Sequence, residues 1–344
     1  MRNVLLLVIL FGTTIIACTP NGGSSKYNEG TFPTTPTNMG SINSAYDDYN
    51  STFPFIGTSC PLVFSSNRGS QGQNFDFVFK WVDIYRDRYD GSYKIGESTD
   101  VNYLLDSYAG SANIDYAISR VNSGADELGP YLISLGSGRG QNAGTINTTV
   151  NYYAFLYASG ISGNLDISYS ENKTTDTHEK PVALSFLNTP KDDAYPCLTK
   201  DSGSIYFCSN RDGNFDIYKA KLPVNGNGFL ASLKDSISPH PVTKDLDLSS
   251  AFDDKCPFIM GTMLIFTSNR PGGYGGFDLY YSKFENDKWS APVNFGPTIN
   301  TASDEYRPIL INVGPGFTNN FMLFSSNRPG GKGGFDLYYV GIDK

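Results

Sequence analysis

The chain has 344 residues, a formal net charge of −8 and a sequence pI near 4.8. Its lysines and arginines form no cluster, which leaves nothing to hold a phosphate backbone and excludes nucleic acid as a partner. Two histidines, His178 and His240, cannot build a multi-histidine metal site, and no P-loop, dinucleotide-binding motif or nucleophile elbow occurs. We therefore expect no cofactor and no bound metal.

Residues 1–17 begin with one arginine and continue as an apolar run that is short for a membrane span, a pattern typical of a signal peptide. The segment is followed by a cysteine in the phrase "IIAC", which resembles the bacterial lipobox. This resemblance implies that Cys18 is lipidated and that the protein is anchored at a membrane of the bacterial cell envelope. The alternative is an ordinary signal peptide followed by an incidental cysteine.

Residues 18–35 are rich in Gly, Ser, Thr and Pro and show no apolar pattern, which predicts a flexible tether. Residues 36–344 form one repetitive domain. The phrase "SSNRGSQGQNFDFVF" starts at Ser65, and variants of it recur to the end of the chain. Each copy carries one recurrent acid, at Asp76, Asp115, Asp166, Asp216, Asp278 and Asp336. Repetition at this spacing indicates a repeat architecture.

A second phrase precedes five of the six copies and consists of an apolar residue, small polar residues and a pair of acids. The pairs are Asp47/Asp48, Asp126/Glu127, Asp192/Asp193, Asp253/Asp254 and Asp304/Glu305. Four of the five pairs are followed by a proline three residues later. The copy around Asp115 lacks this linker.

Each copy is interpreted as short strands separated by turns, because the composition is rich in aromatic residues and glycine. The clearest copy has strands at 195–199, 205–209 and 215–222. No apolar stripe of helical period is recognised after residue 20. These features predict an all-β fold, a six-bladed β-propeller with four antiparallel strands in each blade.

The last copy ends without a fourth strand. Near the N-terminus, Asn38-Met39-Gly40 repeats the pattern of Asn294-Phe295-Gly296, which belongs to the preceding copy. We therefore expect a strand around residues 36–42 to complete the last blade and remove an open sheet edge.

The phrase "SIYFCSNRDGNFDIYKA" resembles the TolB-like, or WD40-like, bacterial β-propeller repeat over most of residues 39–344. The resemblance implies a non-enzymatic, monomeric scaffold that binds an envelope protein, an envelope polymer or a peptidoglycan-associated complex. The alternative is a carbohydrate-active or lactone-active hydrolase with its site in the propeller channel, because a glycosidase needs only two suitably placed carboxylates.

No catalytic residue is identified. The arginines of the Ser-Asn-Arg turns are expected on the same face as the acid pairs, where they would bridge carboxylates and backbone carbonyls. These arginines are Arg68, Arg211, Arg270 and Arg328. The alternative is an acidic ring that binds Ca²⁺ or a basic partner. The repeat acids Asp76, Asp216, Asp278 and Asp336 are likewise expected to be structural.

Four cysteines follow Cys18. Counting outward from the turn at Ser202 and Gly203 places Cys197 opposite Cys208 on the hairpin, where the two can form a disulfide or pack as free thiols. Cys60 and Cys256 have no expected partner.

Overall fold

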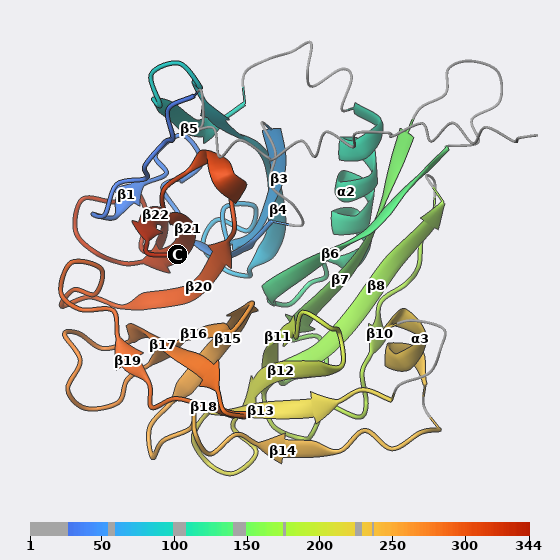
Figure 1. Cartoon of the computed structure of the whole chain (residues 1–344). Helices are drawn as coiled ribbons and strands as arrows, with labels where there is room; N and C mark the ends of the chain where they lie inside the picture. The colour runs from blue at the N-terminus through green and yellow to red at the C-terminus, as the bar shows by residue number, and fades with distance from the viewer. Residues whose placement is uncertain are drawn as a thin grey trace, which may run out of the picture.

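The computed structural model describes residues 27–53, 59–98, 108–139, 149–174, 177–223, 229–235 and 237–344. Its strands form five antiparallel sheets around one axis, so the described part of the chain is a five-bladed β-propeller (Figure 1). Cys18 lies outside the described residues, and its lipidation stays a prediction. No helix in the described ranges is long and apolar enough to cross a membrane.

The blades follow one another along the chain, and each begins at the axis with its innermost strand. Blade 1 contains β2 (Asp48–Thr52), β3 (Ser59–Ser66), β4 (Asp76–Arg86) and β5 (Tyr93–Glu97). Blade 2 contains β6 (Glu127–Arg139), β7 (Thr149–Ser159), β8 (Asp166–Thr174) and β10 (Val182–Ala183), with β9 (Thr177–His178) also paired to β8.

Blade 3 contains β11 (Asp193–Leu198), β12 (Ser204–Ser209), β13 (Asp216–Lys221) and β14 (Val242–Lys244). Blade 4 contains β15 (Asp254–Met260), β16 (Met263–Ser268), β17 (Asp278–Glu285) and β19 (Val293–Asn294), with β18 (Lys288–Trp289) also on β17. Blade 5 contains β20 (Glu305–Ile311), β21 (Asn320–Ser326), β22 (Asp336–Ile342) and β1 (Thr37–Asn38), with the short helix η1 (Gly314–Gly316) between β20 and β21.

The N-terminal strand closes the last blade, as the sequence predicts. Thr37 pairs with Tyr339, and Asn38 pairs with Tyr338. The repeated Asn explains the repeated pattern, because Asn38 donates from Nδ2 to Asp336 at 2.8 Å just as Asn294 donates to Asp278 at 2.9 Å.

The residues just before β1 pack against the propeller. Phe32 is fully buried, and its ring stacks on Phe317 with the centroids 4.2 Å apart. Tyr93 of β5 meets the same ring edge-on, so Phe32 lies where blade 5 meets blade 1. The described end of the predicted tether is therefore part of the hydrophobic core.

The predicted sixth blade does not exist, because the weakest repeat forms a helix. Helix α2 (Tyr108–Val121) contains Asp115, which is exposed. Ile114, Ala117 and Val121 are buried and follow the spacing of one helical face. They pack in a cluster that includes side chains of β3, β4 and β7, so α2 fills the junction between blades 1 and 2 (Figure 1). A second helix, α3 (Phe229–Lys234), precedes β14.

The predicted pairing of Cys197 with Cys208 is wrong. Cys208 lies opposite Ala194, and Cys197 lies opposite Tyr206, because the register of β11 and β12 shifts between Ala194 and Cys197. This bulge moves the two thiols into different hydrophobic clusters. Cys197, Cys208 and Cys256 are buried free thiols, and Cys60 is buried as well.

Candidate functional site

The motif arginines bind the second acid of each linker pair within their own blade. Arg270 Nη2 lies 2.6 Å from Asp254 Oδ1 and 2.7 Å from the carbonyl oxygen of Leu248. Equivalent ion pairs join Arg68 to Asp48, Arg211 to Asp193 and Arg328 to Glu305, at 2.5, 2.6 and 2.9 Å. The carboxylates are fully buried, so each arginine neutralises a charge that the blade has removed from water.

The first acid of each pair joins neighbouring blades. Asp304 Oδ1 accepts the backbone N–H of Phe277 from the preceding blade at 2.9 Å. The same bond recurs at every junction, with acceptors Asp47, Asp126, Asp192 and Asp253. These carboxylates hold the blades together, and within the described residues no group of three or more His, Cys, Asp and Glu side chains is placed to hold a metal ion.

The acids of the other recurrent phrase also bind neighbouring groups. Asp278 and Asp336 accept backbone N–H groups from the turn before them, each with one bond of 2.6 Å. Asp216 forms an ion pair with Lys244. Burial raises the pKa of Asp76, and Asp126 raises it further.

In blade 2 the second acid of the linker, Glu127, has no arginine partner. The position that carries arginine in the other blades is occupied by Ile161. Glu127 is fully buried and accepts hydrogen bonds from the Ser123 hydroxyl at 2.6 Å and the Ser159 hydroxyl at 3.0 Å. Burial is the largest influence on this carboxyl, and it raises its pKa above the ordinary value of 4.5.

We expect Glu127→Gln to increase stability at neutral pH and to flatten the pH dependence of unfolding. A carboxyl whose pKa is raised on folding stabilises the fold fully below its ordinary pKa of 4.5 and loses that contribution as the pH rises through the folded pKa. Melting temperatures of both proteins between pH 4 and 8 should therefore separate as pH increases. Asp254→Asn is the control and should destabilise, because it leaves Arg270 without its carboxylate. A constant difference across pH would contradict the prediction.

Five equivalent positions surround the axis, one on each innermost strand. Each lies at a register shift and has a left-handed backbone, with φ between 47° and 58°. We call them the axial five: Asn50, Gly129, Tyr195, Cys256 and Arg307. Gly129 is needed for space as well as conformation, because a Cβ there would collide with the Tyr195 ring.

Arg307 is the charged member of the axial five. It is fully buried, and its guanidinium carbon lies 5.9 Å from the centre of the Tyr195 ring. Nη2 donates to the carbonyl oxygen of Pro130 at 3.1 Å, whereas Nε and Nη1 have no hydrogen-bond partner among the described residues.

No described acid neutralises Arg307, since no carboxylate of the described residues forms an ion pair with it. The nearby thiols do not supply the missing charge. Burial raises the pKa of Cys197 and that of Cys208 to about 12, although Arg307 acts in the opposite direction. Both thiols are therefore neutral at physiological pH.

A funnel of about 720 Å³ opens at the far end of the innermost strands. We define it by its lining residues, which are Thr52, Phe53, 131–134, 198–200, Ser202, 258–263, Asn312, Asn320 and Lys344. The rings of Tyr131 and Phe258 lie 6.1 Å apart in this lining. Tyr131 directly follows Pro130, so one backbone segment connects the Arg307 contact to the funnel.

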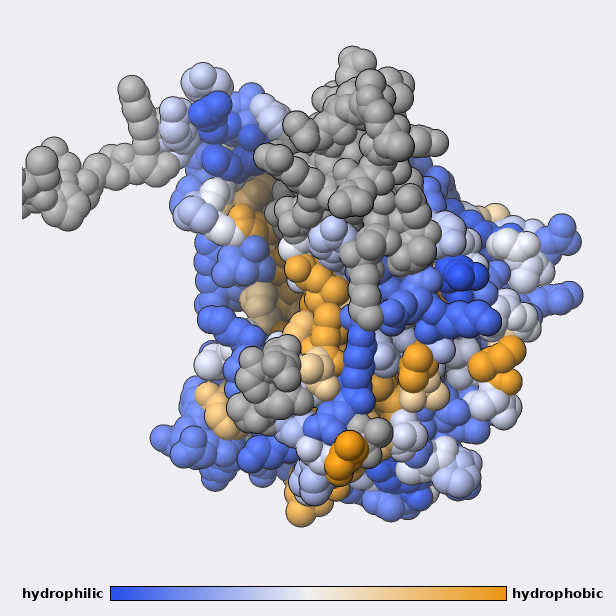
Figure 2. All heavy atoms as spheres, turned by 90° about the vertical axis from the view of Figure 1, so that its right-hand side faces the viewer, coloured by the Kyte–Doolittle hydropathy of each residue, from blue (hydrophilic) through white to orange (hydrophobic). Residues whose placement is uncertain are grey.

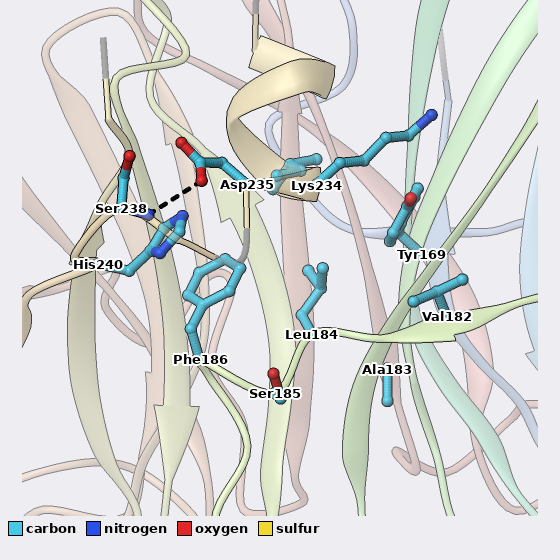
Figure 3. Close-up of a pocket in the computed structure, with 11 residues that line it drawn as sticks. Tyr169, Val182, Ala183, Leu184, Ser185, Phe186, Lys234, Asp235, Ser238 and His240 are labelled. Carbon is cyan, nitrogen blue, oxygen red and sulfur yellow. Dashed lines mark hydrogen bonds between the residues drawn. The ribbon is translucent and has the colours of Figure 1, made fainter. Parts of the chain in front are cut away.

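A second cavity, of about 620 Å³, lies on the flank formed by β8, β10 and α3, where hydrophobic and hydrophilic side chains are interspersed (Figures 2 and 3). His240 stacks on Phe186 with the ring centroids 3.9 Å apart. Asp235 accepts the backbone N–H of Ser238 at 2.9 Å, and the hydrogen bonds from Ser238 lower its pKa to about 2. These polar groups stabilise the loop after α3 and do not converge on the cavity.

Neither a family model nor a curated protein matches the sequence. Among solved structures, the chain is similar to a thermostable family-43 glycoside hydrolase at 11% identity, with 86% of this chain and 88% of that chain covered and a TM-score of 0.48. It is similar to a GH62 α-L-arabinofuranosidase catalytic domain from Coprinopsis cinerea at 11% identity, 92% and 97% coverage and a TM-score of 0.46.

A Penicillium chrysogenum α-L-arabinanase complexed with arabinobiose gives 11% identity, 91% and 98% coverage and a TM-score of 0.46. These structures are five-bladed propellers of glycoside hydrolases and not TolB-like proteins. The TolB-like resemblance, the non-enzymatic envelope scaffold and the predicted absence of enzymatic activity are therefore corrected.

Proposed function

We propose that this protein is a carbohydrate-active propeller that takes a saccharide into the funnel. The observation that carries the proposal is the lining itself. Tyr131 and Phe258 provide aromatic faces, and hydroxyl, amide and ammonium groups surround them. Such a mixture of flat apolar surface and a few polar groups suits a ring that has C–H faces and hydroxyl edges.

The described lining supports binding more directly than bond cleavage. Glycoside hydrolysis commonly uses two carboxyl groups on either side of the scissile bond. The funnel residues given above include no Asp or Glu. At the opposite end of the innermost strands, Arg68, Arg211, Arg270 and Arg328 bind four of the buried acids, and Ser123 and Ser159 bind Glu127. The similarity to glycoside hydrolases concerns the propeller fold alone. The proposal therefore depends on the side chains that line the funnel.

We expect Tyr131→Ala to weaken saccharide binding by about tenfold, because a ring contact of this kind contributes on the order of 1 kcal/mol. Calorimetric titration with oligosaccharides of defined linkage measures binding, and release of reducing ends measures cleavage. Tyr131→Phe keeps the ring and should retain most of the affinity. Tyr274→Ala removes an exposed tyrosine outside the funnel and is the control. Absence of binding and cleavage across the panel would contradict the proposal.

A further inference from the structure

The charged side chains that line the funnel have one sign. Lys200 and Lys344 are the lysines of the lining, and the lining contains no Asp or Glu. This is unusual for a chain with a formal net charge of −8. Lys200 forms no ion pair with any described residue. Lys344 Nζ donates to the carbonyl oxygens of Gly314 and Phe317, so Lys200 is the lysine of the lining whose charge is available to a ligand, and such a charge attracts anions.

Arg307 adds a charge that no acid of the described residues balances with an ion pair. A guanidinium does not lose its proton in a protein, so burial cannot neutralise Arg307 in the way that it neutralises the neighbouring thiols. Its field is weakly screened because the guanidinium is fully buried. The effect of this charge therefore extends beyond atoms in direct contact with the guanidinium.

The fold does not require a cation at this position. The equivalent residues of the other four blades are Asn50, Gly129, Tyr195 and Cys256, all uncharged, and their innermost strands have the same register shift. A buried charge without a partner is destabilising. Arg307 lowers the stability of the fold, and an uncharged residue could take its place. Binding of a ligand explains this arginine better than folding does.

A hydrogen bond to the backbone of β6 connects Arg307 to the funnel. Its Nη2 donates to the carbonyl oxygen of Pro130, and the next residue, Tyr131, lines the funnel with its ring. The positive charge of Arg307 also acts on the Tyr131 hydroxyl and favours its ionised form, against the larger opposing effect of burial. Arg307 is thus electrostatically coupled to a residue that a saccharide would touch.

We propose that the funnel selects saccharides that carry a carboxylate, such as uronic acids, and that Arg307 determines this preference. The inference rests on the proposed function and names the class of saccharide. Arg307 acts through its charge from beneath Tyr131 and is a positioning residue. Lys200 lies in the lining itself and can pair with the same carboxylate directly.

The test compares ligands that differ in the charge of one group and in the methyl that replaces it. Trimers of galacturonate, glucuronate and mannuronate are titrated calorimetrically beside their methyl esters. We expect wild type to bind at least one acid more tightly than its ester by about tenfold, which corresponds to about 1.4 kcal/mol. Arg307→Met should reduce this preference severalfold, mainly through weaker binding of the acid, and Lys200 should retain the remainder. Lys221→Met removes one exposed positive charge outside the funnel and should keep the preference.

Three results would overturn the inference in distinguishable ways. Equal binding of acid and ester by wild type would reject an anionic ligand and leave carbohydrate binding intact. A preference that survives in a folded Arg307→Met protein would reject the role of Arg307. If no acid, ester or neutral oligosaccharide binds, the proposed function fails and the inference fails with it.

Discussion

Replacing Arg270 with alanine should lower the free energy of unfolding by about 3–5 kcal/mol, because it leaves a buried carboxylate without its partner. Asp254 is fully buried, and Arg270 Nη2 lies 2.6 Å from it. The arginine also lies over the rings of Phe266 and Tyr280, at 5.1 and 5.2 Å from their centroids. Chemical denaturation of wild type and variant measures the difference.

A second substitution separates the loss of the ion pair from the loss of packing. Asp254→Asn removes the unpaired charge, so the double variant with Arg270→Ala should recover part of the lost stability. Saccharide binding should be unaffected in any variant that remains folded, since neither residue lines the funnel. A fully stable Arg270→Ala protein would show that the pair contributes nothing to the blade.

Arg307→Met should change stability in the opposite direction. Replacing a buried charge that lacks a carboxylate by an apolar side chain of similar length is expected to raise the free energy of unfolding by about 1–4 kcal/mol. Met adopts the left-handed conformation at position 307 no less readily than Arg does, so the comparison isolates the charge. The denaturation midpoint measures the increase.

The matched control for this prediction is Arg270→Met, the same exchange at an arginine that has a carboxylate partner. It should destabilise, whereas Arg307→Met should stabilise. If both substitutions destabilise by the same amount, Arg307 has an unrecognised structural role and its charge is compensated within the fold.

The number of blades could have been predicted from the linkers rather than from the repeated phrase. The five acid-pair linkers lead into the five innermost strands, because their acids make the contacts within and between blades. The phrase around Asp115 shares composition with the others but lacks a linker. Its Ile114, Ala117, Ile118 and Val121 already have helical spacing in the sequence, so this error was avoidable.

Other features depend on backbone geometry that residue types do not specify. Counting outward from a turn assumes a regular hairpin, and the left-handed residue Tyr195 breaks that regularity before Cys197 is reached. Tyrosine has no particular preference for this conformation, so nothing in the sequence marks the bulge.

The positions of the axial five could have been recognised by aligning the linkers. In each linker the residue two positions after the second acid varies without any chemical theme, from Asn50 to Gly129 to Arg307. Repeated structural positions usually keep one residue type, as the motif arginines do. When the repeats are aligned, this position varies although its neighbours do not, and one repeat has a charged residue there. Such variation indicates that a requirement other than the repeat fold selects the residue.

The closure of blade 5 also sets the order in which this protein can fold. Thr37 pairs with Tyr339, so the partners are separated by 302 residues (339 − 37). Emerging from the ribosome, β1 is made first and its partner last. Strand pairing across such a separation is slow, and blades 1 to 4 can assemble from local hairpins beforehand. Until β22 is synthesised, β1 has no sheet to join, which makes ring closure the last step in assembling the five blades.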